Sequence, residues 1–209
     1  MKIHNFAQGS GEWFAARRGV VTASEVDALV TPLWKVRTGA GVNTYLNLKV
    51  AERIMGYSKS ELAGWAADQG NVIEKIARPF FEVITGQTVQ QAGFVTTDDG
   101  KCGCSPDGLL GEDGGLELKA PQPPKHIEYL LAGVVPPDYR SQVQFSLWIT
   151  RRAYWQFVSF SVYLPPLIVR VEPDKAAFST FNDVIPAFLS DLDAATTKVT
   201  AMMQTKGRG

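Results

Sequence analysis

Two carboxylates and an amine lie close together in the middle of the sequence, in residue types that can hydrolyse a phosphodiester. Asp107 lies in the run Ser105-Pro106-Asp107-Gly108, and the run Glu117-Leu118-Lys119 begins ten residues after Asp107. Between them, Gly111-Glu112-Asp113-Gly114-Gly115 is typical of a turn between two antiparallel strands. The sequence therefore predicts that the two runs lie side by side.

Strand alternation decides which of these side chains meet. Successive side chains on a strand point to opposite faces, so Leu116 and Leu118 are expected in the core. Glu117 and Lys119 then project together toward Asp107. Two converging carboxylates repel each other unless a cation lies between them, and Mg²⁺ or Mn²⁺ suits such oxygen ligands. A lysine beside the metal can position or deprotonate an attacking water, so the chemistry indicated is phosphodiester hydrolysis.

The same motif also has an ordinary structural reading. Asp-Gly is a common turn dipeptide, and Glu-x-Lys on an exposed strand face is often a solvated ion pair. Taken alone, the motif fits that reading as well as it fits catalysis.

Two further groups of polar side chains on expected helices favour a functional reading. Glu74 is flanked by apolar residues midway along a long helix and could supply a third acidic ligand, although alone it reads as a surface residue beside Lys75. Gln142 and Gln144 point about 200° apart on a helix. One of them can therefore face the site, while the other is expected at the surface.

A candidate phosphate clamp lies near the start of the chain. Arg17 is close in sequence to the hydroxyls of Thr22 and Ser24, and an arginine with a hydroxyl at a helix start can bind phosphate. The alternative is that Arg17 and Arg18 are plain surface charges. Trp13, also in this segment, is expected to pack rather than to touch DNA.

Taken in order along most of the chain, these residues resemble the phage lambda exonuclease family. This family comprises alkaline exonucleases of the viral-recombinase type within the PD-(D/E)xK nuclease superfamily. The matching segments are Trp13-x-x-x-Arg17-x-Gly19, Thr22-Ala23-Ser24-Glu25-Val26, Gly70-x-x-x-Glu74-x-x-Ala77, Ser105-Pro106-Asp107-Gly108-Leu109, Gly115-Leu116-Glu117-Leu118-Lys119-Ala120-Pro121 and Tyr139-x-x-Gln142-Val143-Gln144.

The resemblance implies a fold and a set of catalytic roles. The fold is an α/β, restriction-endonuclease-like core with a central mixed β-sheet flanked by helices. Asp107, Glu117 and the backbone carbonyl of Leu118 are the implied metal ligands, with Glu74 a further ligand for a second ion. Lys119 is the implied catalytic lysine. Whether one or two metal ions act stays open.

The resemblance also implies how the DNA end is held and what becomes of the DNA. Arg17, Ser24, Ser105 and Gln142 correspond to positions that bind the terminal 5′-phosphate. The implied activity is a Mg²⁺-dependent 5′→3′ exonuclease, with Mn²⁺ able to substitute, that degrades one strand of linear double-stranded DNA. The implied partners are two further copies of the chain in a ring-shaped homotrimer and a single-strand annealing protein that acts in recombination.

Two other functions are compatible with the motif. An endonuclease of the same superfamily, of the restriction or junction-resolving type, would share the metal site without the clamp formed by Arg17, Ser24 and Gln142. A non-catalytic DNA-binding recombination scaffold would keep only the fold. The complete set of Asp107, Glu117 and Lys119 speaks against the scaffold.

Composition limits the class of protein. The 209 residues include 21 basic and 21 acidic side chains, so any DNA binding must use a local basic groove rather than net charge. Cys102 and Cys104 are too close in sequence for a relaxed disulfide, and the two histidines are too few for a usual zinc site. There is no signal-peptide-like start and no apolar run of about 18 residues, so we expect a cytoplasmic protein without membrane contact.

The periodicity of apolar residues predicts the elements that position these groups. A single nuclease domain is expected over 1–209, with a helical part over about 1–86, a sheet core over about 87–172 and a C-terminal helix over about 173–203. Helices are predicted at 23–29, 42–55, 66–84, 125–131, 138–150 and 173–203. Strands are predicted at 88–95, 102–110, 115–119, 153–162 and 167–172.

Overall fold

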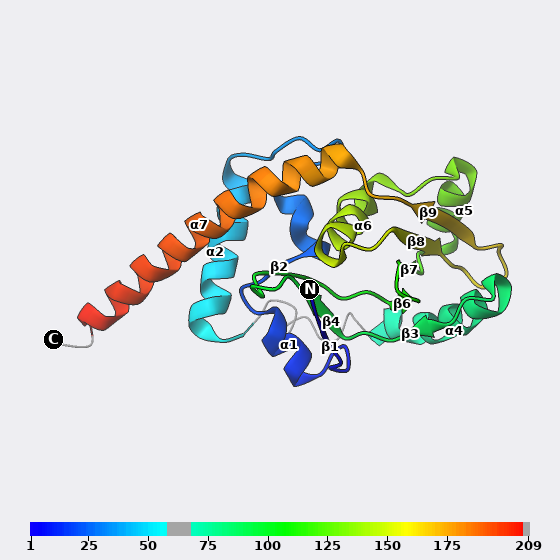
Figure 1. The fold of residues 1–209 in the computed structure, drawn as a ribbon, viewed down its shortest axis with the longest axis horizontal. Helices are drawn as coiled ribbons and strands as arrows, with labels where there is room; N and C mark the ends of the chain where they lie inside the picture. Colours follow the sequence, from blue (N-terminus) through cyan, green and yellow to red (C-terminus); the bar gives the residue numbers. More distant parts are fainter. Residues whose placement is uncertain (58–67, 207–209) are drawn as a thin grey trace.

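The strands of the described residues divide between two mixed sheets (Figure 1). The computed structural model describes the backbone of residues 1–57 and 68–206 and the side chains of residues 1–57 and 76–204. One sheet has the order β1-β4-β5-β2 and the other the order β3-β6-β7-β8-β9. In chain order the strands are β1 (Lys2–His4), β2 (Val21–Thr22), β3 (Val89–Gln90), β4 (Phe94–Thr96), β5 (Cys102–Cys104), β6 (Gly108–Leu110), β7 (Gly114–Lys119), β8 (Tyr154–Ser159) and β9 (Leu167–Val171).

The helices surround these sheets and largely match the predicted ranges. The helix predicted over 42–55 is present and ends at Gly56, whose φ of 71° is the left-handed conformation that favours glycine at a helix end. The described helices are α1 (Gly11–Arg17), the 3₁₀ helix η1 (Ala23–Ala28), α2 (Ala40–Met55), α4 (Asp68–Thr85), α5 (Pro123–Ala132), α6 (Pro137–Thr150) and α7 (Lys175–Lys206).

Strand β7 lies in the middle of the five-stranded sheet. It pairs antiparallel with β6, where Gly115 lies opposite Leu109, and parallel with β8, where Glu117 lies opposite Phe157. The predicted hairpin that brings Asp107 back beside Glu117 is therefore present. A Cβ at Gly115 would overlap the ring of Trp155, so the absence of a side chain there lets β7 and β8 pack closely.

Helices α4 and α6 pack against side chains from opposite faces of this sheet. Leu116 and Leu118 are buried in one cluster with Phe81 of α4. Phe157 lies in another cluster with Val143 of α6. The prediction that β7 sends its leucines into the core is confirmed, and its polar face is left toward α6.

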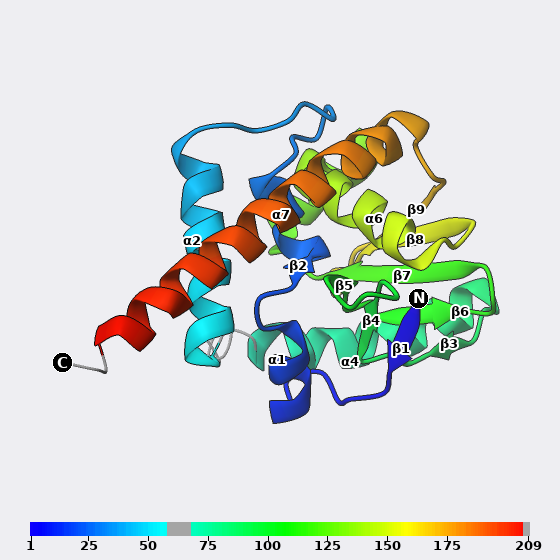
Figure 2. The same cartoon turned by 60° about the vertical axis from the view of Figure 1, so that its left-hand side comes forward.

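A larger core joins the four-stranded sheet to the helices α2, η1, α6 and α7. Tyr45 of α2 stacks on Phe188 of α7 with ring centroids 5.3 Å apart, and Phe145 of α6 lies edge-on to Phe181 of α7 at 5.0 Å. Helix α7 thus runs across both α2 and α6, and its C-terminal end extends away from the sheets (Figures 1 and 2).

Several element boundaries differ from the predicted ones. The strand predicted at 88–95 is interrupted between β3 and β4, and the strand predicted at 102–110 is interrupted between β5 and β6. Pro106 lies in the second interruption and has no N–H to donate to a neighbouring strand. The short strands β1 and β2 lie in the part of the chain read as helical. The division of the chain into one nuclease domain with three parts stays a prediction.

No helix within residues 1–57 and 68–206 is long and apolar enough to cross a membrane.

Candidate active site

The hairpin of β6 and β7 brings Asp107 against the main chain of β7. The N–H of Asp107 donates to the carbonyl of Leu116 at 3.0 Å, and the N–H of Leu118 donates to Oδ2 of Asp107 at 2.5 Å. The carboxylate is therefore fixed beside Leu118, one residue from both Glu117 and Lys119. The structure therefore places the carboxylate of Asp107 near Glu117 and Lys119, as predicted.

Glu117 is the centre of the polar cluster on the face of β7 toward α6. Its Oε1 lies 2.6 Å from Nζ of Lys119 and accepts a hydrogen bond of 2.5 Å from Nε2 of Gln142. The Glu117 side chain is only 4% exposed, so its charge needs these two donors. The structure thus brings Gln142 to the carboxylate site.

Opposing effects act on the ammonium of Lys119. Burial alone would lower the pKa of Lys119, but the negative charges of Glu117 and Asp107 outweigh it and hold this pKa above its usual range. The ammonium also lies 5.0 Å from the ring centroid of Tyr139 on α6. Lys119 is therefore a protonated donor in the arrangement that the structure shows.

The donor set fits a hard divalent cation. Asp107 and Glu117 supply carboxylate oxygens and Leu118 supplies a main-chain carbonyl, and oxygen ligands of this kind suit Mg²⁺ or Mn²⁺. Glu74 lies in α4, but its side chain is outside the described residues. Among the described side chains, no group of three or more histidines, cysteines, aspartates or glutamates could hold a metal ion.

The candidate phosphate clamp joins two neighbouring segments near the start of the chain to the distant segment that carries Ser105. Arg17 on α1 donates from Nη1 to Oγ of Ser105 at 2.8 Å and from Nη2 to Oγ of Ser24 at 3.4 Å. Ser105 comes two residues before Asp107, so the clamp and the carboxylates meet in one turn of the chain. Of the four residues predicted to bind the terminal phosphate, Arg17 contacts Ser24 and Ser105, and Gln142 contacts Glu117.

The indole ring of Trp13 packs against the guanidinium of Arg17. Its Nε1 donates to Oγ of Ser105 at 3.0 Å and to the carbonyl of Gly93 at 3.1 Å. The Arg17 guanidinium carbon lies 4.3 Å from the centroid of the Trp13 ring. Trp13 therefore packs, as expected, and it does so against the clamp itself.

The guanidinium of Arg17 is held mainly by neutral groups. Its hydrogen-bond acceptors are hydroxyls, and its buried Nε has no partner within the described part of the chain. Burial lowers the pKa of Arg17 below its ordinary value, while the nearby charge of Glu25 acts in the opposite direction. A half-buried cation with spare donor capacity is suited to an incoming anion such as phosphate.

The expectation that Gln144 lies at the surface is wrong. Gln144 is buried, donates from Nε2 to the carbonyl of Glu172 at 2.8 Å and accepts from the N–H of Asp174 at 2.9 Å. It therefore fixes the connection between β9 and α7. Helix α6 is buried on more than one face, so a residue that points away from the site still lies in the interior.

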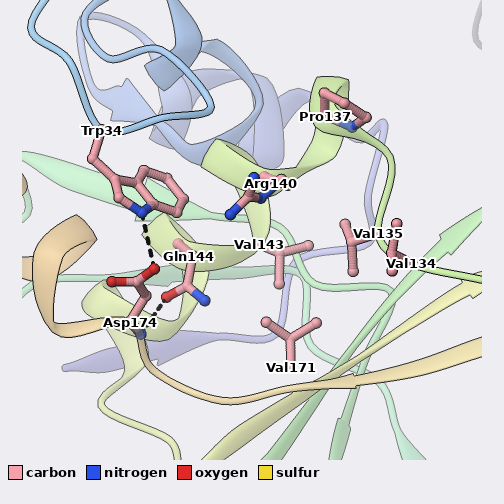
Figure 3. Close-up of a pocket in the computed structure, with 9 residues that line it drawn as sticks. All are labelled: Trp34, Val134, Val135, Pro137, Arg140, Val143, Gln144, Val171 and Asp174. Atoms are coloured by element: carbon pink, nitrogen blue, oxygen red, sulfur yellow. Dashed lines mark hydrogen bonds between the residues drawn. The ribbon is translucent and has the colours of Figure 1, made fainter.

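A cavity of about 430 Å³ lies on this second side of α6. Trp34 closes one side of it and donates from Nε1 to Oδ2 of Asp174 at 2.9 Å, while Val143 and Val171 line its floor (Figure 3). Among the described residues that line the cavity there is none of the predicted site residues. The cavity is therefore separate from the carboxylate site.

Sequence reasoning missed a buried charge cluster on α2. Lys49 and Glu52 are both almost fully buried, and Lys49 lies 2.8 Å from Glu25 and 2.9 Å from Glu52. The available signal was the spacing of Tyr45, Lys49 and Glu52, which puts all three on one face of the predicted helix.

Fold and site together define a viral-recombinase type of nuclease. Residues 12–153 match the sequence pattern of the YqaJ-like viral recombinase domain family. The chain belongs to this family. The resemblance to the lambda exonuclease family is thereby confirmed, as is the PD-(D/E)xK type of fold.

Three individual proteins are similar to this chain. The alkaline exonuclease LHK-Exo from Laribacter hongkongensis is 30% identical, with a TM-score of 0.82 over 94% of this chain and 99% of that chain. A phage-related exonuclease from Haemophilus somnus 129PT is 11% identical and shares the fold, with a TM-score of 0.64 over 86% of this chain and 96% of that one. The Escherichia coli (strain K12) protein ExoD is 27% identical over 64 residues, which are 29% of this chain and 74% of ExoD.

Proposed function

We propose that this nuclease is a Mg²⁺-dependent 5′→3′ exonuclease that degrades one strand of linear double-stranded DNA from a 5′-phosphorylated end. The observation that carries the proposal is the connection between Arg17 and Asp107. Arg17 binds Ser105, and Ser105 precedes Asp107 by two residues. A terminal phosphate bound by Arg17 would therefore lie next to the carboxylates, and the adjacent phosphodiester would be the one cleaved.

The residues have distinct roles in this proposal. Asp107, Glu117 and the carbonyl of Leu118 would hold Mg²⁺, or Mn²⁺ in its place, with Glu74 as a further acidic ligand. The chemistry supplied by the ion when bound is neutralisation of negative charge on the phosphate. Lys119 orients water and donates to the oxygen that gains charge as the bond breaks. Its ammonium is protonated beside Glu117, which suits this donor role.

The clamp residues bind rather than react. Arg17, Ser24 and Ser105 present a guanidinium and two hydroxyls, which are strong donors to a terminal phosphate. Gln142 donates a hydrogen bond to Glu117 and would add an amide donor on the carboxylate side of the site. A 5′-hydroxyl end carries less negative charge, so the clamp favours a phosphorylated end.

The family gives further support. LHK-Exo has also been crystallised in complex with dAMP. A nucleoside monophosphate is the product class of an exonuclease, and we propose that this chain releases such products. We further propose a homotrimer around duplex DNA, and a single-strand annealing protein that loads on the exposed strand during recombination. The expected cytoplasmic location stays a prediction.

Digestion of matched DNA substrates tests the proposal. The protein is incubated with Mg²⁺ and linear duplexes bearing either 5′-phosphate or 5′-hydroxyl ends, with closed circles as the control. Release of mononucleotides from the phosphorylated strand alone is the expected result. Equal attack on closed circles would instead identify an endonuclease, and binding without release under any divalent ion would identify a non-catalytic scaffold.

A further inference from the structure

A buried lysine lies behind the candidate clamp, outside the catalytic cluster. The side chain of Lys49 on α2 is 2% exposed. Its Nζ lies 2.8 Å from Oε2 of Glu25 and 2.9 Å from Oε2 of Glu52. A buried ammonium is costly unless it is fully paired. The two carboxylates provide that pairing, and the fold retains a charged group that the proposed chemistry does not use.

Hydrogen bonds connect this lysine to the clamp. Oγ1 of Thr22 donates to Oε2 of Glu25 at 2.6 Å and lies 3.3 Å from Oγ of Ser24. Ser24 in turn accepts from Arg17. Thr22 directly precedes η1, but its side chain makes no capping hydrogen bond. Its hydroxyl instead joins Glu25 to Ser24.

Glu52 makes a second connection to the segment that carries Arg17. Its Oε2 accepts a hydrogen bond of 3.0 Å from the N–H of Gly19, two residues after Arg17. Lys49 therefore holds two carboxylates, one tied to the Ser24 hydroxyl and the other to the end of α1. Both sides of the clamp depend on the same ammonium.

The charges around Arg17 explain why this ammonium matters. Glu25 and Glu52 both act electrostatically on Arg17. With Lys49 present, both carboxylates are paired with its ammonium. Without it, Glu25 would be an unpaired carboxylate near the half-buried Arg17 guanidinium. It would then compete with a phosphate for Arg17 and repel the phosphate directly.

We propose that Lys49 is a positioning residue for the 5′-phosphate clamp, holding Glu25 and Glu52 away from Arg17 and thereby keeping Arg17 and Ser24 available to the DNA end. This inference rests on the proposed function, since it assumes that the clamp binds a terminal phosphate. Lys49 itself touches neither the DNA nor the carboxylates of Asp107 and Glu117.

Lys49→Met tests the inference, because methionine fills similar space without the charge. Binding of duplexes with 5′-phosphate or 5′-hydroxyl ends is measured in EDTA, and KM and kcat are measured with Mg²⁺. The loss of a charge-assisted contact predicts a fall of roughly 10-fold in selectivity for the phosphorylated end. This fall should appear in the Kd and the KM, with kcat at saturating DNA retained. Lys198→Met, at an exposed lysine of α7, is the matched control.

A double variant separates positioning from a purely structural role. Lys49→Met combined with Glu25→Gln removes the competing carboxylate along with its counter-charge. We expect the end selectivity to return toward that of the wild type. Selectivity that Lys49→Met leaves unchanged, or that the double variant fails to recover, would overturn the inference.

Two further variants keep the result interpretable. If Lys49→Met does not fold, Thr22→Val decides. Valine keeps the side-chain shape of threonine but removes the hydroxyl that joins Glu25 to Ser24 and leaves Lys49 in place. Lost selectivity supports the inference, and unchanged selectivity overturns it. Arg17→Ala separates the two proposals. End selectivity that Arg17→Ala abolishes but Lys49→Met preserves overturns only the role of Lys49. A wild-type protein without end selectivity overturns the proposed function, and the role of Lys49 with it.

Discussion

Gln142 on α6 donates a hydrogen bond of 2.5 Å to Oε1 of Glu117 on β7. The same oxygen forms the ion pair with Lys119. Gln142, which the family resemblance assigns to binding of the terminal phosphate, therefore contacts Glu117, which it assigns to binding of the metal ion. The proposed binding and cleavage sites are thus neighbours joined through one carboxylate, and variants of single residues can separate them.

Lys119→Ala should abolish hydrolysis and leave DNA binding intact. Removal of a positioned proton donor or base typically costs about 10²- to 10⁴-fold in rate, whereas Arg17 and its hydroxyl partners remain in place. Nucleotide release and fluorescence anisotropy of a labelled duplex measure the two properties separately. Lys175→Ala, at an exposed position at the start of α7, is the control. Rapid digestion by the Lys119 variant would show that this lysine does not act on the reaction.

Asp107→Ala should lose divalent-ion binding and turnover together. Oδ2 of Asp107 also accepts the N–H of Leu118, so a destabilisation of about 1–3 kcal/mol is expected from the unpaired strand amide. Mn²⁺ titration by calorimetry and thermal unfolding measure the two effects. Asp113→Ala changes an exposed aspartate of the same hairpin and should alter neither. Undiminished Mn²⁺ affinity in the Asp107 variant would remove this residue from the metal site.

Arg17→Ala should mainly weaken the preference for a phosphorylated end. The guanidinium is the charged member of the clamp, so its loss should raise KM for 5′-phosphorylated duplexes and change KM for 5′-hydroxyl duplexes little. The measurement is the ratio of kcat/KM between the two substrates. Arg170→Ala, at an exposed position on the edge strand β9, controls for the loss of general positive charge. An unaltered ratio would mean that the clamp is assigned to the wrong residues.

Much of the site could be predicted from sequence because its geometry is local. The separation of Leu116 and Leu118 from Glu117 and Lys119 follows from strand alternation alone. The turn that returns Asp107 to β7 was visible as a glycine-rich run. The end of α2 at Gly56 follows from the left-handed conformation that glycine adopts readily.

The remainder depends on contacts between distant segments. Strands of two or three residues, such as β1 and β2, carry no periodic pattern and form only because a partner strand is present. Gln144 is buried because β9 and α7 cover it, which the sequence of α6 alone does not encode. The pairing of Lys49 with Glu25 needs the fold to bring α2 and η1 together.

The two cysteines predict how the stability of the protein depends on alkaline pH. Cys102 and Cys104 are free and buried on β5, and burial raises the pKa of each thiol to about 12. In the unfolded chain the thiols have a pKa of about 8.5. The stabilisation from the raised thiol pKa values is therefore complete below about pH 8.5. It is lost as the pH rises toward the pKa of the thiols in the folded protein.

Replacing both cysteines isolates this contribution from other groups that titrate at high pH. The combined Cys102→Ala and Cys104→Ala protein should lose less of its free energy of unfolding than the wild type does between about pH 8 and pH 11. Urea unfolding at each pH measures this difference in slope. A thiol reagent should modify neither cysteine in the native wild type at about pH 8, and both in the unfolded chain. Equal slopes in the two proteins, or rapid native modification, would show that the thiols ionise normally and that β5 is open to solvent.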